Sequence, residues 1–152
     1  MIKLEAAKNT VLICVGGCVV TDITGYVAAV YMRGIQFCLV PTSILAMVDA
    51  AIGGKNGIDV GVYKNMVGLI RQPKFLLFDP SLLKSLPKAA WQNGFAEIIK
   101  HACIKDAAMF KLLQRHKLSD FQKDAGLLTS LIQKNVLIKT KVVIGDEFEQ
   151  GE

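Results

Sequence analysis

The stretch VLICVGGCVVTD, residues 11–22, joins a short apolar run to a glycine pair and a second apolar segment. An apolar run ended by Gly16-Gly17 is typical of a strand followed by a turn. Asp22–Met32 is apolar, Ala-rich and free of proline, which predicts a helix that Gly34 ends. In such a unit, backbone amides at the turn and at the amino end of the helix can face an anion. A purely structural turn fits the residues equally well, because the pattern is not G-x-G-x-x-G.

The segments that follow continue the alternation of strand and helix. Gln36–Val40 predicts a second strand, and Phe75–Phe78 a further short one. Thr42 predicts the cap of a second helix that reaches about Val48. Ile52–Gly61 has four glycines in ten residues and is expected to be a loop. Alternation predicts a parallel sheet with helices on its faces, and the polar segments after its strands then share the ligand-binding edge.

The last part of the chain is expected to be helical. Helical spacing runs through Trp91–Gln114 and Leu127–Ile144, and the polar segment Ser119–Gly126 separates the two. No strand is expected after Pro87.

The composition predicts a packed protein with an anionic small-molecule ligand. Hydrophobic residues make up 52% of the 152 residues, charged residues 20%, and the net charge is +5. The lysines are spread along the chain, which argues against nucleic acid, although a merely basic surface also explains the charge. The longest apolar stretch, Phe37–Gly54, contains Pro41 and Asp49, so no membrane span is expected.

The four cysteines form no C-x-x-C pair, and the first residues, MIKLEAAKN, lack the apolar core of a signal peptide. These features indicate buried, reduced thiols in a cytoplasmic protein. The cysteines are Cys14, Cys18, Cys38 and Cys103.

Two clusters of polar residues are candidates for chemistry. Lysines and acids surround glycines in VDAAIGGKNGIDVGVYKN, residues 48–65, where they suit a phosphate or a carboxylate, although a solvated loop is an alternative. In GFAEIIKHA, residues 94–102, Glu97 and His101 share one helix face beside Lys100. Glu and His both bind zinc, but a site would need another carboxylate, so the spacing alone favours a salt-bridging helix face.

The order of these segments carries a resemblance to a known family. The chain contains, in this order, VGGCVVTD, PTSILAMVDAAIGGKNG, GFAEIIKHACIKD and KVVIGDEFEQG. From about Val11 to Glu152 it resembles the 3-dehydroquinate synthases of the sugar-phosphate cyclase group. The resemblance implies an α/β fold: the C-terminal half of a Rossmann-like NAD-binding domain, residues 1–85, then the start of an all-α metal- and substrate-binding domain, residues 86–152.

The resemblance also implies an activity. Members of this family are lyases of the shikimate pathway to aromatic amino acids, and they convert 3-deoxy-D-arabino-heptulosonate 7-phosphate to 3-dehydroquinate and phosphate. They use NAD and one divalent ion, Zn²⁺ or Co²⁺, and the ion acts as a Lewis acid. A cytoplasmic homodimer with a sugar phosphate as substrate, and with no nucleic-acid or membrane partner, is therefore expected.

Site residues follow from the resemblance, position by position. The turn over the cofactor would comprise Gly16, Gly17, Cys18, Val19, Val20, Thr21 and Asp22. Further cofactor-lining residues would be Thr42, Ser43, Leu82, Leu83, Lys84 and Ser85. The substrate pocket would contain Asp49, Lys55, Lys64, Asn65, Lys100, Lys139 and Glu149, with Lys55 and Lys64 also near NAD. Arg33 would reach the substrate phosphate of a neighbouring subunit, and Glu97 would bind the metal. His101 falls at a variable position of the family, so its pairing with Glu97 is interpreted as coincidental.

The chain departs from the family pattern at several positions. Cys18 stands in place of a third glycine, where its Cβ would be harmful if the backbone needed positive φ. Asn56 replaces a threonine, and Ala102 a glycine. The family's two zinc histidines lie in segments beyond Glu152, so the chain is expected to be an internal fragment that is inactive alone.

Three alternatives stay open. Another sugar-phosphate cyclase, making an inosose or a valiolone, is disfavoured by Lys139 and GFAEIIK. An iron-type alcohol or glycerol dehydrogenase is disfavoured because Asp22 is followed by Ile-Thr-Gly-Tyr and not by lysine. A non-catalytic nucleotide-binding fragment is the third.

Overall fold

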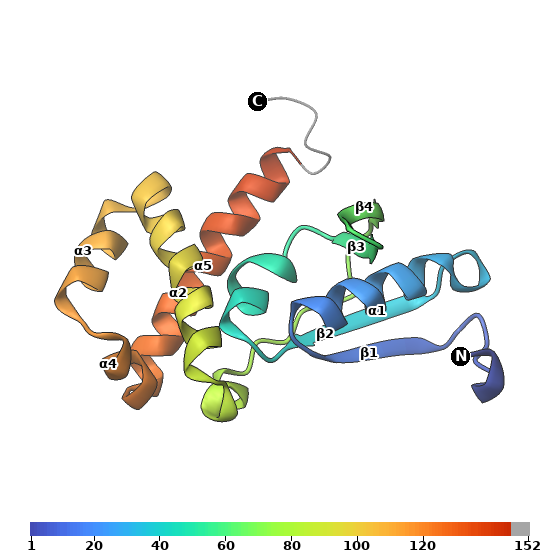
Figure 1. The fold of residues 1–152 in the computed structure, drawn as a ribbon, viewed down its shortest axis with the longest axis horizontal. Helices are drawn as coiled ribbons and strands as arrows, with labels where there is room; N and C mark the ends of the chain where they lie inside the picture. The colour runs from blue at the N-terminus through green and yellow to red at the C-terminus, as the bar shows by residue number, and fades with distance from the viewer. Residues whose placement is uncertain (147–152) are drawn as a thin grey trace.

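The computed structural model describes residues 1–146 and divides them between a small α/β part and a group of helices (Figure 1). The α/β part contains η1 (Ile2–Leu4), β1 (Val11–Gly16), α1 (Cys18–Val30), η2 (Tyr31–Arg33), β2 (Gln36–Pro41), η3 (Ala46–Ala50), β3 (Lys55–Val60) and β4 (Tyr63–Ile70). The remaining elements are η4 (Pro80–Ser85), α2 (Lys88–Lys105), α3 (Ala107–Arg115), α4 (Leu118–Lys123) and α5 (Ala125–Gly145). The predicted α/β class is confirmed. The division at residues 85 and 86 stays a prediction.

β1 and β2 form the predicted parallel pair. Their register runs from Val11 opposite Gln36 to Gly16 opposite Pro41. α1 packs against both strands and buries Cys14 and Phe37, so this face of the pair forms one of the two cores. The carboxyl ends of both strands therefore meet at one edge, as the alternating pattern predicts.

The Phe75–Phe78 segment forms less of a strand than expected. It makes a single parallel bridge, between Leu39 and Leu76. Leu39 donates to the carbonyl of Phe75 at 3.2 Å, and Leu77 donates to the carbonyl of Leu39 at 2.9 Å. The segment thus lies beside β2 without extending into a ladder.

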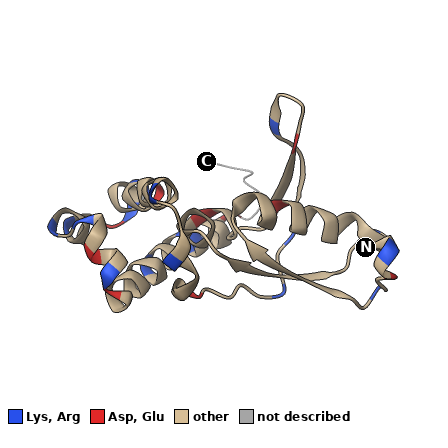
Figure 2. Cartoon of the chain, turned by 60° about the horizontal axis from the view of Figure 1, so that its bottom comes forward, with Lys and Arg blue, Asp and Glu red and all other residues tan. Residues whose placement is uncertain are grey.

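The prediction of a loop over Ile52–Gly61 is wrong, because β3 pairs with β4 in an antiparallel hairpin. Its glycines permit close strand approach. Gly57 lies opposite Gly68, and a Cβ at Gly68 would lie 2.6 Å from the carbonyl oxygen of Asn56. Gly61 has φ of 61° at the turn. Figure 2 shows the hairpin projecting from the body of the protein.

The second predicted helix starts one residue later than expected. Ser43, and not Thr42, caps the turn, since its Oγ accepts from Ala46 N at 3.3 Å. The turn then widens into the π-helical segment η3. Ile44, Met47 and Val48 are fully buried among side chains of the helical part, so this segment ties the sheet to the helices.

The helix predicted over Trp91–Gln114 is two helices. The backbone leaves helical geometry at Asp106, whose side chain caps α3 by accepting from Met109 N at 2.9 Å. α4 fills the expected polar separator, and Phe121 from α4 is buried against Phe95. Asp124 caps α5 by accepting from Leu127 N at 2.9 Å. Polar residues that suggested a loop therefore serve as helix caps.

Two surface expectations are tested by the structure. Cys14 and Cys38 are buried as expected, but Cys18 is half-buried and Cys103 is exposed, so the expectation of four buried thiols is wrong. Lysines and arginines are spread over the elements, as the sequence indicated (Figure 2). Among the described residues, none of the helices has the length and hydropathy needed to cross a membrane.

Candidate functional site

The Gly16-Gly17 turn brings the end of β1, the start of α1 and the end of β2 together. A Cβ at Gly16 would lie 2.6 Å from Cβ of Val20, so only glycine fits there. Thr42 N donates to Gly16 O at 2.9 Å. Gly17 is the N-cap of α1, and no side chain caps this end within residues 1–146. The amino end of α1 is therefore available to an anion.

Cys18 causes no backbone strain in this turn. It is the first residue of α1, and it is not among the described non-glycine residues with positive φ. Burial raises the pKa of the Cys18 thiol, and a hydrogen bond with Ser43 partly opposes that rise. The sequence left open whether its Cβ could be accommodated, and the helical backbone accommodates it.

Asp22 differs from the prediction in its position on the helix and in the pKa of its carboxyl group. The sequence placed it at the start of the helix, but α1 begins four residues earlier, at Cys18. Burial, followed by the charges of Asp49 and Asp59, raises the pKa of the Asp22 carboxyl to about 6. The helix dipole therefore does not dominate its ionisation.

A pocket of about 610 Å³ opens between α1, η3 and the β3–β4 hairpin. Its walls contain five predicted site residues that come from distant parts of the chain: Asp22, Asp49, Lys55, Asn65 and Lys139. Asn65 has φ of 55°, and its N–H donates to Asp59 Oδ1 at 3.0 Å. Asn56 lines the same pocket, which thus combines two acids, two lysines and two amides at the ligand-binding edge.

An ion pair fixes one side of the pocket. Lys139 Nζ of α5 lies 2.7 Å from Asp49 Oδ1 of η3. The two side chains are 27% and 32% exposed, so the pair is partly shielded from water. It connects the helical part to the segment that precedes the glycine-rich turn.

Other predicted site residues lie outside the pocket walls. Lys64 is exposed on β4, and Lys100 is exposed on α2, where it pairs with Glu97. Arg33 is exposed just before β2, and has φ of 63°. In the segment Leu82–Ser85, Leu83 is buried in the helical core. Glu149 lies outside the described residues.

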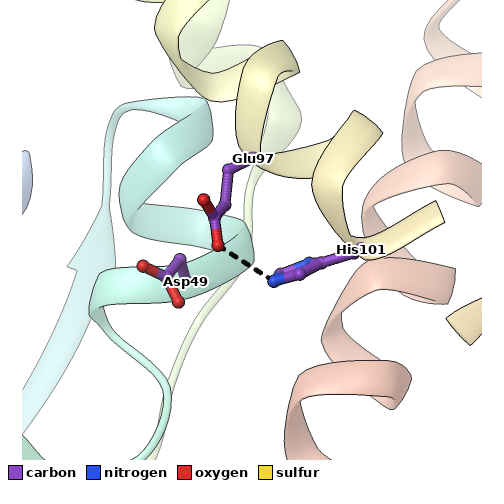
Figure 3. Close-up of side chains that lie close together, drawn as sticks. All are labelled: Asp49, Glu97 and His101. Atoms are coloured by element: carbon purple, nitrogen blue, oxygen red, sulfur yellow. Dashed lines mark ion pairs between the residues drawn. The ribbon is translucent and has the colours of Figure 1, made fainter. Parts of the chain in front are cut away.

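Glu97, His101 and Asp49 form a compact cluster between α2 and η3 (Figure 3). His101 Nε2 lies 3.1 Å from Glu97 Oε1. One ligand atom from each of the three residues lies within 4.8 Å of the others. The salt-bridging helix face is confirmed, since Glu97 pairs with both Lys100 and His101. Asp49 supplies the further carboxylate that the spacing on the helix could not reveal.

The sequence also missed two buried amides. Asn135 of α5 is fully buried and contacts His101, and no motif pointed to it. Asn56, read only as a departure from the family, donates to Gly54 O at 2.5 Å and to Arg71 O at 3.0 Å. Both amides follow from long-range packing, for which a single sequence has no local signal.

Solved structures identify the class of fold. A 2-epi-5-epi-valiolone synthase from Streptomyces hygroscopicus subsp. jinggangensis, solved with NAD⁺ and Zn²⁺ bound, matches with a TM-score of 0.93 at 30% identity, over 99% of this chain and 42% of that chain. A 2-deoxy-scyllo-inosose synthase complexed with carbaglucose-6-phosphate, NAD⁺ and Co²⁺ matches with a TM-score of 0.84 at 25% identity, over 98% and 41%. The fold is that of the sugar-phosphate cyclases.

Sequence comparison then gives the family. The family descriptions 3-dehydroquinate synthase N-terminal and 3-dehydroquinate synthase C-terminal match residues 1–93 and 94–152. The chain therefore belongs to the 3-dehydroquinate synthase family. The 3-dehydroquinate synthases of Helicobacter hepaticus and Halalkalibacterium halodurans are 46% and 41% identical over 95% of this chain. The chain spans 40% of the length of each of these relatives.

Proposed function

We propose that these residues belong to a 3-dehydroquinate synthase, which converts 3-deoxy-D-arabino-heptulosonate 7-phosphate to 3-dehydroquinate and phosphate. The observation that carries this proposal is the pocket that gathers Asp22, Asp49, Lys55, Asn65 and Lys139 at one edge of the fold. The family resemblance implies a site role for each of these five residues. Their convergence on one pocket supports a single site.

The proposed cofactors are NAD and Zn²⁺ or Co²⁺. The uncapped amino end of α1 fits a pyrophosphate, because backbone amides and the helix dipole favour an anion there. The side chains of Asp49, Glu97 and His101 offer the oxygen and nitrogen donors that zinc prefers. When bound, NAD supplies reversible hydride transfer and the metal supplies Lewis acidity.

The proposed role of the chain's own residues is to bind and orient the substrate. Lys55 and Lys139 hold its phosphate and carboxylate, since ammonium groups bind such anions through charge-assisted hydrogen bonds. The ion pair with Asp49 fixes the position of the Lys139 ammonium. Asn65, with its left-handed backbone, adds an amide at the same wall. Lys64 and Lys100 are exposed and can turn towards a bound ligand.

The remaining features of the proposal concern the whole protein. We propose a cytoplasmic homodimer of the shikimate pathway, in which Arg33 reaches the substrate phosphate in the neighbouring subunit. Arg33 lies at the amino end of β2 and the pocket lies beyond its carboxyl end, which fits a contact made across subunits. The 152-residue chain alone is proposed to be inactive, because family members use two further histidines.

Two chimeras test the activity. Residues 1–146 replace the matching segment either in the Halalkalibacterium halodurans 3-dehydroquinate synthase or in the Streptomyces 2-epi-5-epi-valiolone synthase. Each chimera is assayed with NAD, Zn²⁺ and the substrate of its host. The proposal predicts phosphate release and 3-dehydroquinate from the first chimera only. It is contradicted if the first chimera folds and binds NAD and zinc without turnover.

A second candidate function is another sugar-phosphate cyclase. The TM-score of 0.93 to the valiolone synthase favours it. Turnover by the second chimera alone would select this candidate. The third alternative is a nucleotide-binding fragment without catalysis. Calorimetry distinguishes it from the two enzymes: if the 152-residue chain is a binding module, adding NAD to it gives saturable heat, and otherwise it does not.

A further inference from the structure

The loop between α1 and β2 contains three consecutive residues with positive φ. The angle is 48° at Met32, 63° at Arg33 and 107° at Gly34. Glycine adopts such values without steric cost, but the other two residues do so only when the surrounding structure holds them there. Burial does not hold them, since Met32 is 46% exposed and Arg33 is exposed as well. The backbone of this loop is therefore held by other contacts.

The side chain of Lys8 makes the first of these contacts. Its Nζ donates to Met32 O at 2.8 Å and to Gly34 O at 2.5 Å, the carbonyls on either side of Arg33. An ammonium group has three donors, and its hydrogen bonds to carbonyls are charge-assisted. Figure 1 shows the segment before β1 and this loop at the same end of the α/β part, away from the helices. Lys8 thus fixes the backbone on both sides of one exposed arginine.

Two further contacts hold the loop from other parts of the chain. Tyr31 Oη donates to Ala6 O at 2.8 Å and ties the segment before β1 to the loop. Arg71, which follows β4, donates from Nη1 to Ala28 O at 3.2 Å. A Cβ at Gly34 would lie 2.5 Å from the same Nη1, so the guanidinium packs directly against the loop. Distant segments therefore converge on this short connection.

The residue at the centre of the loop has no partner in the described chain. The Arg33 guanidinium makes no hydrogen bond or ion pair with any other residue of 1–146. A strained backbone that is supported from several sides, at an exposed charged residue, indicates a role for that residue outside its own fold. Under the proposed function, this role is to contact a phosphate in the neighbouring subunit. Such a contact is favoured if the loop is already fixed before the subunits meet.

We propose that Lys8 is the positioning residue of Arg33, and that its two hydrogen bonds hold the loop in the conformation from which Arg33 binds the phosphate of a neighbouring subunit. The inference rests on the proposed role of Arg33 and extends it. Lys8 is neither a pocket residue nor one of the site residues that the family resemblance implies. Its effect on activity should therefore pass entirely through Arg33.

The first test is limited proteolysis of the 152-residue chain with an arginine-specific protease. The arginines are Arg33, Arg71 and Arg115, so replacing a lysine leaves every cleavage site unchanged. Lys8→Met is compared with Lys3→Met. Lys3 is an exposed residue of η1 that makes no hydrogen bond or ion pair with the other described residues. Cleavage after Arg115, the exposed last residue of α3, reports unfolding of the chain as a whole.

Lys8→Met is expected to be cleaved after Arg33 at least about 5-fold faster than the unmutated chain, because local opening of the loop becomes easier. Cleavage after Arg115 should not change, and Lys3→Met should behave as the unmutated chain. Lys8→Arg keeps charged donors and should restore slow cleavage. Equal cleavage after Arg33 in Lys8→Met and Lys3→Met overturns the proposal. An equal rise at Arg115 also overturns it, since Lys8 would then support the whole fold.

The second test measures kcat/KM in whichever of the two chimeras turns over. Arg33→Met is expected to lower kcat/KM about 10-fold and Lys8→Met at least about 3-fold, with recovery in Lys8→Arg. The double variant Lys8→Met/Arg33→Met should be no less active than Arg33→Met alone, because a residue that acts through Arg33 has no effect without it. Losses that multiply in the double variant overturn the proposal. If both chimeras fold without turnover, the proposed function is refuted, and the cleavage rates alone decide this inference.

Discussion

Gly25 of α1 and Asn56 of β3 are in direct contact, and a Cβ at Gly25 would lie 1.7 Å from Asn56 Oδ1. The Asn56 amide also bonds the carbonyls of Gly54 and Arg71, which hold the base of the β3–β4 hairpin. This contact therefore sets the distance between two walls of the pocket. It also gives Asn56 a structural role.

Gly25→Ala is expected to destabilise the protein by about 1–3 kcal/mol, because the added methyl overpacks this contact. Gly145→Ala is the control, since a Cβ there meets nothing within 4 Å. Urea unfolding measures the free energy of unfolding of both variants. The double variant Gly25→Ala/Asn56→Ala should recover part of the loss. Equal stability of the two single variants contradicts the contact.

Asp22 should make stability depend on pH. Its pKa is raised to about 6, so the folded state binds this proton more tightly than the unfolded state. The stability that protonation contributes is present below about pH 4 and is lost as the pH rises to about 6. After discounting for solvent screening of this half-buried group, the loss is about 1 kcal/mol. Asp22→Asn should remove it.

The control for that measurement is Asp79→Asn, which should have the opposite sign. Hydrogen bonds from Ser81 lower the pKa of Asp79, so its contribution is lost as the pH falls. Unfolding by urea between pH 3 and pH 7, with chelator present, compares both variants with the unmutated chain. The assigned pKa shift would be refuted if the free energy of unfolding of Asp22→Asn and of the unmutated chain changed with pH in the same way.

The ion pair of Lys139 with Asp49 should matter for function more than for stability. Lys139→Met in the active chimera is expected to lower kcat/KM at least about 10-fold, because an anion-binding ammonium is lost. Its effect on unfolding should stay below about 1 kcal/mol, as for other partly exposed pairs. Lys141→Met, a nearby exposed lysine outside the pocket walls, is the control. Identical kinetics of the two variants would remove Lys139 from the site.

Thiol reactivity tests the placement of the cysteines. Cys103 is exposed and should react first with a disulfide reagent such as DTNB, while Cys14 and Cys38 are buried and should react only on unfolding. Peptide mapping after a short exposure identifies the labelled residue. Labelling of Cys14 before Cys103 would contradict the packing of β1 against α1.

Features with a local signal were predicted from the sequence. The strand in β1 follows from neighbouring residues, and the parallel pairing follows from the alternation of elements. The predicted helix end at Gly34 is wrong, because α1 ends at Val30 and Gly34 follows the separate turn η2. The β3–β4 hairpin was missed because its glycines indicate a loop until Gly57 and Gly68 are placed opposite each other. Asp106 was missed for a similar reason, since a polar residue between two apolar stretches becomes a cap only when the chain turns there.

The candidate site was predicted in its residue types but not in its geometry. Family motifs selected Asp49 and Lys139, but only the packing of α5 against η3 shows that they form an ion pair. The position of Asn135 beside His101 depends on the same packing. Contacts of this kind join residues far apart in the chain, and a single sequence carries no signal for them.

The most direct test of the central claim is phosphate release by the 3-dehydroquinate synthase chimera and its Lys55→Ala variant. The claim is that the pocket between α1, η3 and the hairpin is where this family binds its substrate. Lys74→Ala is the control, since Lys74 is exposed and lies outside the pocket walls. We expect the chimera to be active and the Lys74→Ala variant to keep the same kcat/KM. Lys55→Ala is expected to lower kcat/KM by on the order of 100-fold or more, because it removes a group that stabilises charge in the transition state. Undiminished phosphate release by Lys55→Ala would contradict the claim.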